Sequence, residues 1–208
     1  KYDWSWMIAA AVAGILVRYW YAGTWLFLLQ SLGAKVAGAR LALFSVYAKS
    51  WLGRYVPGGA TWILGKVYFA SKLGISKTKL GVSSFLEGVL QIIVVLASAS
   101  AMLAFDSRVQ SFGAIWFVGL VAACIIGFAS VLPPVFNRLV SWAYKKARKQ
   151  AIDPTSLPDG RLIGSGIFAF LVSSVLSGLS FFFVAKAVAP GLGWDTVLFI
   201  IGASNLAS

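Results

Sequence analysis

The sequence predicts an all-α fold, a polytopic membrane helix bundle with a re-entrant broken-helix hairpin and interfacial amphipathic helices. Three observations support this prediction. Hydrophobic residues make up 60% of the 208 residues and charged residues only 12%, which is outside the range of soluble domains. Several apolar runs approach or exceed the roughly 20 residues that cross a bilayer. Most charged residues lie between these runs. We expect one transmembrane domain over residues 1–208, incomplete at both ends.

The apolar runs predict the helices in order. The run from Trp4 to Val17 is short for a full crossing. The residues Arg18 to Tyr21 that follow are typical of a membrane interface, where a guanidinium reaches water and aromatic rings lie among the headgroups. We therefore expect Ala22 to Leu32 to form a separate helix on the membrane surface. The later runs predict three crossings and a final segment too short to cross, at residues 80–105, 112–132, 162–188 and 196–208.

Small residues also predict where helices pack closely. Ser173 with Ser177, and Ser174 with Gly178, lie four residues apart in the last predicted crossing. Small side chains at this spacing lie on one helix face and allow a neighbouring backbone to approach.

One apolar stretch, at about 41–73, is broken in its middle. Pro57 cannot donate a backbone hydrogen bond, and Gly58 and Gly59 can adopt backbone angles that other residues avoid. The flanking segments are too apolar for a water-filled loop, so we expect two short helices that enter and leave the membrane by the same face. Non-helical backbone at membrane depth needs protein or water around it, so neighbouring helices should cover this re-entrant hairpin.

The same break predicts a binding site for a lipid phosphate. A helix that restarts at about Thr61 has free N–H groups at its first turn, where the positive end of the helix dipole favours an anion. Arginine binds phosphate as a two-pronged donor and lysine as a point charge. We therefore expect the phosphate to contact residues on both sides of the break: Arg54, Pro57, Gly58, Gly59, Thr61 and Lys66. Alternatively, the two cations only reach back to the interface on the cytoplasmic side.

Glu87 is the only carboxylate within a predicted crossing, where a charge is costly unless it is paired. One interpretation is an intramembrane ion pair with Arg54 or Lys66 that tunes the anion site or exchanges partners with the ligand. The other is a static structural ion pair, or a glutamate at headgroup level. The sequence supports both interpretations.

The distribution of lysine and arginine predicts the orientation. Of the 18 basic residues, eight lie in segment 33–80 and six in segment 136–161, whereas the opposite side holds Lys1, Arg108 and Lys186. The positive-inside rule places both rich segments in the cytoplasm. We therefore expect a multi-pass protein of the cell (plasma) membrane with its basic loops on the cytoplasmic side.

A helix at about 135–149 is expected to lie on the cytoplasmic membrane surface. Pro133 and Pro134 end the preceding crossing, because no regular helix continues through two prolines. After them, apolar and basic residues separate onto opposite helix faces, which is typical of an interfacial amphipathic helix. The basic face carries Arg138, Lys145, Lys146, Arg148 and Lys149.

Several classes of function are not expected. The chain has no histidine, a single cysteine (Cys124) and six scattered acids, which predicts no metal site, no cofactor and no enzyme active site within these residues. A net charge of +12 is also typical of nucleic-acid binding. Here the basic residues fall between apolar runs, so contact with anionic lipid headgroups explains them better.

The order of several short segments matches a known family: Arg18-Tyr19-Trp20, Tyr55-Val56-Pro57-Gly58-Gly59, Lys66, Gly74-Ile75-Ser76 and Ser83-Ser84-Phe85-Leu86-Glu87. In this order the chain resembles the lysylphosphatidylglycerol synthase transmembrane-domain family, which is also described as flippase-like. The resemblance covers most of the chain and is specific around Pro-Gly-Gly. It implies a multispan protein that moves phospholipid or polyprenyl-phosphate-linked headgroups between leaflets, with Pro57, Gly58, Gly59, Lys66 and Glu87 as motif residues.

The expected function is therefore binding and translocation of a phosphate-bearing lipid. The alternative is a non-catalytic membrane subunit that presents a lipid substrate to a cytoplasmic transferase. The expected partners are a phospholipid or polyprenyl-phosphate lipid, the membrane itself, and either a cytoplasmic transferase or a second copy of this chain. Nucleic acid is not expected as a partner.

Overall fold

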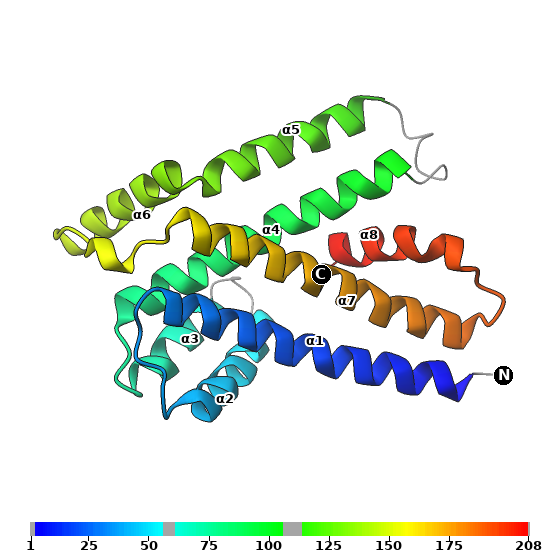
Figure 1. Ribbon diagram of the computed structural model, residues 1–208, viewed down its shortest axis with the longest axis horizontal. Helices are drawn as coiled ribbons and strands as arrows, with labels where there is room; N and C mark the ends of the chain where they lie inside the picture. The colour runs from blue at the N-terminus through cyan, green and yellow to red at the C-terminus, as the bar shows by residue number, and fades with distance from the viewer. Residues whose placement is uncertain (1–2, 56–60, 106–113, 208) are drawn as a thin grey trace. The chain divides into compact units, whose positions relative to one another are not determined.

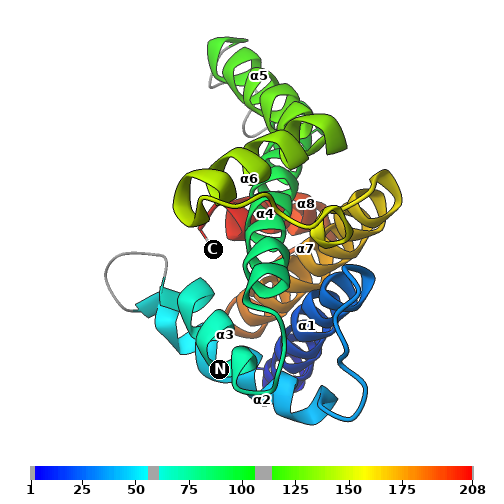
Figure 2. The same ribbon diagram turned by 90° about the vertical axis from the view of Figure 1, so that its left-hand side faces the viewer.

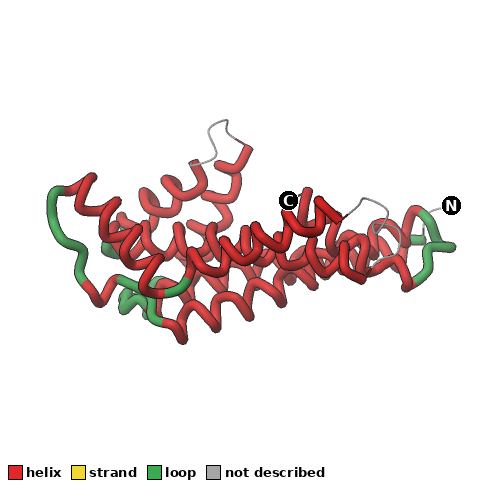
Figure 3. The backbone as a smooth tube through the Cα atoms, turned by 90° about the horizontal axis from the view of Figure 1, so that it is seen from above, coloured by secondary structure: helices red, strands yellow, loops and turns green. Residues whose placement is uncertain are grey.

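The computed structural model describes residues 3–55, 61–105 and 114–207. These residues form helices joined by loops and contain no strand, as Figure 3 shows. The elements labelled in Figure 1, with the short 3-10 helices η1, η3 and η4, are α1 Trp4–Ser31, α2 Arg40–Trp51, η1 Leu52–Tyr55, α3 Thr61–Ser71, α4 Lys77–Phe105, α5 Ala114–Val131, α6 Pro133–Arg148, η3 Pro154–Ser156, α7 Gly160–Val188, η4 Trp194–Thr196 and α8 Val197–Ala207. The predicted all-α fold is confirmed.

Within the described residues, α1, α4 and α7 are long and apolar enough to cross a membrane. The pair α5 and α6 passes the same test as one broken unit, with a bend of 70°. Pro133 and Pro134 occupy the first positions of α6, where a missing N–H group costs little, and they cannot continue α5. Several helices could therefore cross a membrane, which is consistent with a multi-pass membrane protein.

The predicted interface break within the first helix is wrong, because α1 runs without interruption from Trp4 to Ser31. The indole N–H of Trp20 donates a 2.8 Å hydrogen bond to the carbonyl oxygen of Ala169 on α7. Further along, Ala22, Trp25 and Leu29 are at most 3% exposed and lie on one helix face at the three- and four-residue spacing. The expected surface helix 22–32 is therefore part of a buried core.

The chain forms two compact units, and α1, α4 and α7 contribute residues to both. Unit 1 comprises Lys1–Trp20, Gln91–Ala129 and Ile167–Ser208. Unit 2 comprises Tyr21–Leu90 and Ser130–Gly166.

In unit 1, small and polar side chains join α8 and α4 to α7. A Cβ added at Gly178 would lie 2.7 Å from the Cα of Ile201, so the two backbones are in direct contact. The amide of Asn205 donates a 2.7 Å hydrogen bond to the Ser174 hydroxyl, which is also 2.8 Å from the hydroxyl of Ser98. The small residues of α7 therefore permit close helix packing, as their spacing predicted.

In unit 2, glycines allow α3 to pack closely against α2 and η1. A Cβ added at Gly65 would lie 3.2 Å from the Ser50 hydroxyl, and one at Gly53 would lie 3.0 Å from the backbone nitrogen of Trp62. The first half of α4 lies between α3 and α6 (Figures 1 and 2). The two short helices predicted on either side of residues 56–60 are thus present, while their re-entrant path through a membrane stays a prediction.

Candidate functional site

The site lies in unit 2 and is built around one buried ion pair. The ammonium of Lys66, on α3, pairs with carboxylate oxygen Oε2 of Glu87, on α4. Each side chain is only 1% exposed. The hydroxyl of Tyr47, on α2, donates a 3.0 Å hydrogen bond to the other carboxylate oxygen, Oε1. Three helices therefore each place one polar side chain at the same point.

Aromatic rings surround the Lys66 ammonium. Its Nζ atom lies 4.2 Å from the ring centroid of Trp62, 4.4 Å from that of Tyr47 and 5.3 Å from that of Trp25. Trp62 precedes Lys66 by one helical turn, so it reaches the ammonium from the same helix, whereas Trp25 comes from α1. The negative faces of aromatic rings attract a cation at these distances. Four helices thus contribute to the surroundings of Lys66.

Because this pair is buried, loss of one partner strongly affects stability. Removing two charges from water costs several kcal/mol per ion, and their attraction offsets this only where the remaining polar atoms also find partners. Here both oxygens of Glu87 are bound, and Lys66 has a carboxylate and three rings. Loss of either partner alone would leave a buried charge, at a cost of about 3–5 kcal/mol. Lys66 and Glu87 are therefore required together.

Other polar side chains near the pair have unused hydrogen-bonding capacity. Among the described residues, Trp25 Nε1, Ser50 Oγ and Ser84 Oγ are buried without a hydrogen-bond partner. Ser84 lies one turn before Glu87, and Ser50 contacts Gly65, the residue before Lys66. A buried polar group without a partner costs about 1–3 kcal/mol. These three groups are all able to donate, which suits an oxygen-rich ligand.

The structure describes only part of the predicted phosphate site. Thr61 is the first residue of α3 and is partly exposed, and Lys66 follows on the same helix. Arg54 lies in η1, but its side chain is outside the described part of the chain, as are Pro57, Gly58 and Gly59. Of the two cations that the sequence offered to Glu87, Lys66 pairs with it, and the side chain of Arg54 lies outside the described part of the chain.

Trp25 and Tyr47 are among the residues of this site that the sequence did not predict. Trp25 was assigned to a surface helix, although it shares a three- and four-residue spacing with other buried positions of α1. Tyr47 carries a hydroxyl on the buried face of α2, which also holds Leu43, Val46 and Ser50. A tyrosine hydroxyl on a buried helix face is the signal that could have indicated a buried polar partner, because such groups are nearly always hydrogen-bonded.

Comparison of the chain with models of protein families, with curated proteins and with solved structures finds no match. The resemblance to the lysylphosphatidylglycerol synthase transmembrane-domain family therefore stays a prediction that rests on the residues around Pro57, Gly58 and Gly59. Within the described residues, no three His, Cys, Asp or Glu side chains come together in the way that a metal ion needs. The chemistry of the site is thus that of a charge pair with an aromatic wall.

Proposed function

We propose that the protein is a flippase-like membrane protein that binds and translocates a lipid with a phosphate-bearing headgroup, either a phospholipid or a polyprenyl-phosphate-linked lipid. The observation that carries the proposal is the burial of Lys66 and Glu87 between α3 and α4, where α4 is a candidate membrane span. Ionisable residues within membrane segments are costly and mark substrate or ion pathways. In the sequence, Lys66 also follows the predicted break at residues 57–59, on the helix α3 that comes after it.

In this proposal the lipid phosphate takes the place of Glu87 beside Lys66. The physical barrier to moving a lipid headgroup across a bilayer is the cost of taking its charge out of water. Lys66 supplies a countercharge inside the protein, and its three rings keep the ammonium in place during the exchange. Glu87 keeps its hydrogen bond from Tyr47, which offsets part of the cost of leaving its carboxylate without Lys66. Ser50 and Ser84 are the nearby donors that suit the phosphate oxygens.

We further propose that the protein lies in the plasma membrane with its basic segments in the cytoplasm. The helix α6 supports this orientation, because Lys145, Lys146 and Lys149 at its end are exposed. Exposed basic side chains at the end of an amphipathic helix favour contact with anionic headgroups. Lipid headgroups would then enter the site from the cytoplasmic face.

The test is lipid translocation by the purified chain in vesicles, measured with a fluorescent phospholipid that an added reductant bleaches only in the outer leaflet. Lys66→Met with Glu87→Leu replaces the ion pair by apolar side chains of similar volume, which is often neutral for stability. We expect this folded double variant to translocate about a hundredfold more slowly. The reason is that an uncompensated charge within a membrane costs about 2.5–3.5 kcal/mol and each 1.4 kcal/mol is tenfold.

The matched control is Lys72→Met. Lys72 lies just beyond the end of α3, and its ammonium is 4.2 Å from the exposed ring of Tyr68, so it is a second cation near the same helix but outside the buried site. This variant should translocate at the wild-type rate.

A folded Lys66 and Glu87 double variant that also translocates at the wild-type rate refutes exchange at Lys66. A wild-type protein that binds the lipid without moving it refutes translocation and favours the alternative subunit that presents lipid to a cytoplasmic transferase.

A further inference from the structure

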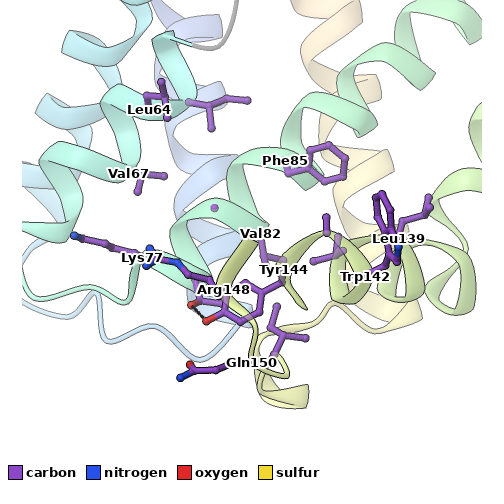
Figure 4. Close-up of a pocket in the computed structure, with 16 residues that line it drawn as sticks. Leu64, Val67, Lys77, Val82, Phe85, Leu139, Trp142, Tyr144, Arg148 and Gln150 are labelled. Atoms are coloured by element: carbon purple, nitrogen blue, oxygen red, sulfur yellow. Dashed lines mark hydrogen bonds between the residues drawn. The ribbon is translucent and has the colours of Figure 1, made fainter. Parts of the chain in front are cut away.

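A groove in unit 2, separate from the buried ion pair, has the features of a second ligand site. It opens between α3, α4 and α6 and has a volume of about 750 Å³, within the range of ligand pockets in proteins. Most of its wall is apolar (Figure 4), with Leu64 and Val67 from α3, Val82 and Phe85 from α4, and Leu139 and Trp142 from α6. Lys66 and Glu87 are not among its lining residues.

One end of the groove is cationic. Lys77 is the first residue of α4 and Arg148 is the last residue of α6; both line the groove, and Figure 4 shows them on the side away from Leu64 and Phe85. None of the sixteen lining residues is acidic, and neither cation makes an ion pair within the described residues. Two like charges repel each other unless an anion lies between them. The groove therefore combines an anion-attracting end with an apolar body.

Contacts between α4 and α6 hold this arrangement. The hydroxyls of Thr78 and Tyr144 lie 3.3 Å apart and form a hydrogen bond beside the cationic end. Thr78 directly follows Lys77 on α4, and Tyr144 lies one turn before Arg148 on α6. The rings of Phe85 and Phe136 join the same two helices, with centroids 5.7 Å apart. The two helix ends that carry the cations are thus positioned by the fold.

We propose that this groove binds one molecule of an anionic phospholipid. Its phosphate lies between Lys77 and Arg148, since arginine contacts phosphate oxygens in a two-pronged geometry and lysine supplies a point charge. One acyl chain lies along Val82, Phe85 and Leu139. A free phosphate ion would leave this apolar wall uncovered, which is why we assign a lipid. The proposal does not depend on translocation at Lys66, because the two sites share no residue.

The experiment measures retention of added phosphatidylglycerol by the full chain in detergent micelles, using native mass spectrometry, with phosphatidylcholine as the zwitterionic comparison. We expect one tightly held phosphatidylglycerol and at least about tenfold weaker phosphatidylcholine binding, which corresponds to the loss of a charge-assisted contact. Lys77→Ala with Arg148→Ala should weaken phosphatidylglycerol binding by about ten- to a hundredfold. The matched control is Lys35→Ala with Arg40→Ala, which removes one lysine and one arginine from exposed positions that do not line the groove.

A second pair of variants tests the apolar body of the groove. Gly81 lies on the groove wall, and a Cβ added there meets no atom within 4 Å, so Gly81→Leu fills space without disturbing the fold. This variant should lose phosphatidylglycerol while both cations remain. Gly164→Leu is its control, because Gly164 on α7 has the same open surroundings but does not line the groove.

Four results would overturn the proposal. They are wild-type affinity in the Lys77 and Arg148 double variant, equal weakening by the Lys35 and Arg40 control, wild-type affinity in Gly81→Leu, and displacement of the lipid by inorganic phosphate at the same concentration. Failure of this proposal is distinguishable from failure of the proposed function. Variants of the groove residues should lose the retained lipid and translocate normally. Replacement of Lys66 and Glu87 should impair translocation and leave lipid retention in the groove unchanged.

Discussion

The hydroxyl of Tyr47 donates a 3.0 Å hydrogen bond to Oε1 of Glu87, a residue 40 positions further along the chain. The other oxygen of the same carboxylate is bound by Lys66. Glu87 is therefore held from α2 and α3 at once, which fixes the orientation of its side chain. In a buried network of this kind each hydrogen bond strengthens the others, so that removal of one member affects all three.

Replacement of Tyr47 by phenylalanine tests this network. Tyr47→Phe keeps a ring beside Lys66 but removes the hydrogen bond to Oε1, so we expect the free energy of unfolding to fall by about 1.5–3 kcal/mol, the range for hydrogen bonds to charged groups. Tyr144→Phe is the control, because it removes a 3.3 Å contact between two partly buried hydroxyls, worth about 0.5–1.5 kcal/mol. Reversible unfolding in mixed micelles measures both. Equal losses in the two variants would contradict the assigned role of Tyr47.

Gly178 and Gly119 should respond to alanine with opposite signs. A Cβ at Gly178 would lie 2.7 Å from the Cα of Ile201, so α7 and α8 must separate, and we expect a loss of about 1–3 kcal/mol in the free energy of unfolding. A Cβ at Gly119, on α5, meets no atom within 4 Å, so Gly119→Ala should be stabilising by about 0.5–1 kcal/mol through better helix propensity. Thermal unfolding of both variants decides the matter, and a stable Gly178→Ala would show that the helices are not in contact there.

Asp153 should make stability depend on acidic pH. The hydroxyl and the backbone N–H of Thr155, together with the charge of Lys79, hold the pKa of the Asp153 carboxyl below its ordinary value. A lowered folded-state pKa means that the stabilisation is complete above about pH 4, and that it is lost as the pH falls through the folded-state pKa. Asp153→Asn should therefore have a flatter profile of Tm against pH below about pH 4. Parallel profiles for the two proteins would contradict this assignment.

The features that sequence predicted well are those that local chemistry determines. Pro133 and Pro134 end one helix and begin the next whatever surrounds them, because proline has no N–H group to continue a helix. The separation of apolar and basic residues after them depends only on the helical repeat, and α6 forms at nearly the predicted residues, Pro133–Arg148. Long apolar runs likewise identified α4 and α7 to within a few residues.

The features that sequence predicted poorly depend on distant partners. Arg18 to Tyr21 has the composition of a membrane interface, yet α1 continues through it, because tertiary packing decides where those side chains lie. The choice of Lys66 as the partner of Glu87 depends on the rotation of α3 against α4, which no local pattern encodes. Tyr47 completes the site from a third helix, and its distance of 40 residues from Glu87 made the contact inaccessible to reasoning from spacing.

Gly53 and Gly65 carry only hydrogen where other residues carry a β-carbon, and they lie where α2, η1 and α3 meet. Lys66 directly follows Gly65, and Tyr47 lies one turn before Ser50, the residue that Gly65 contacts. Each methyl or methylene group introduced at position 65 would push the two helix axes further apart. Alanine, serine or valine at position 65 would therefore lengthen the distance between the Lys66 ammonium and the Tyr47 phenol in small steps. No charged group would change.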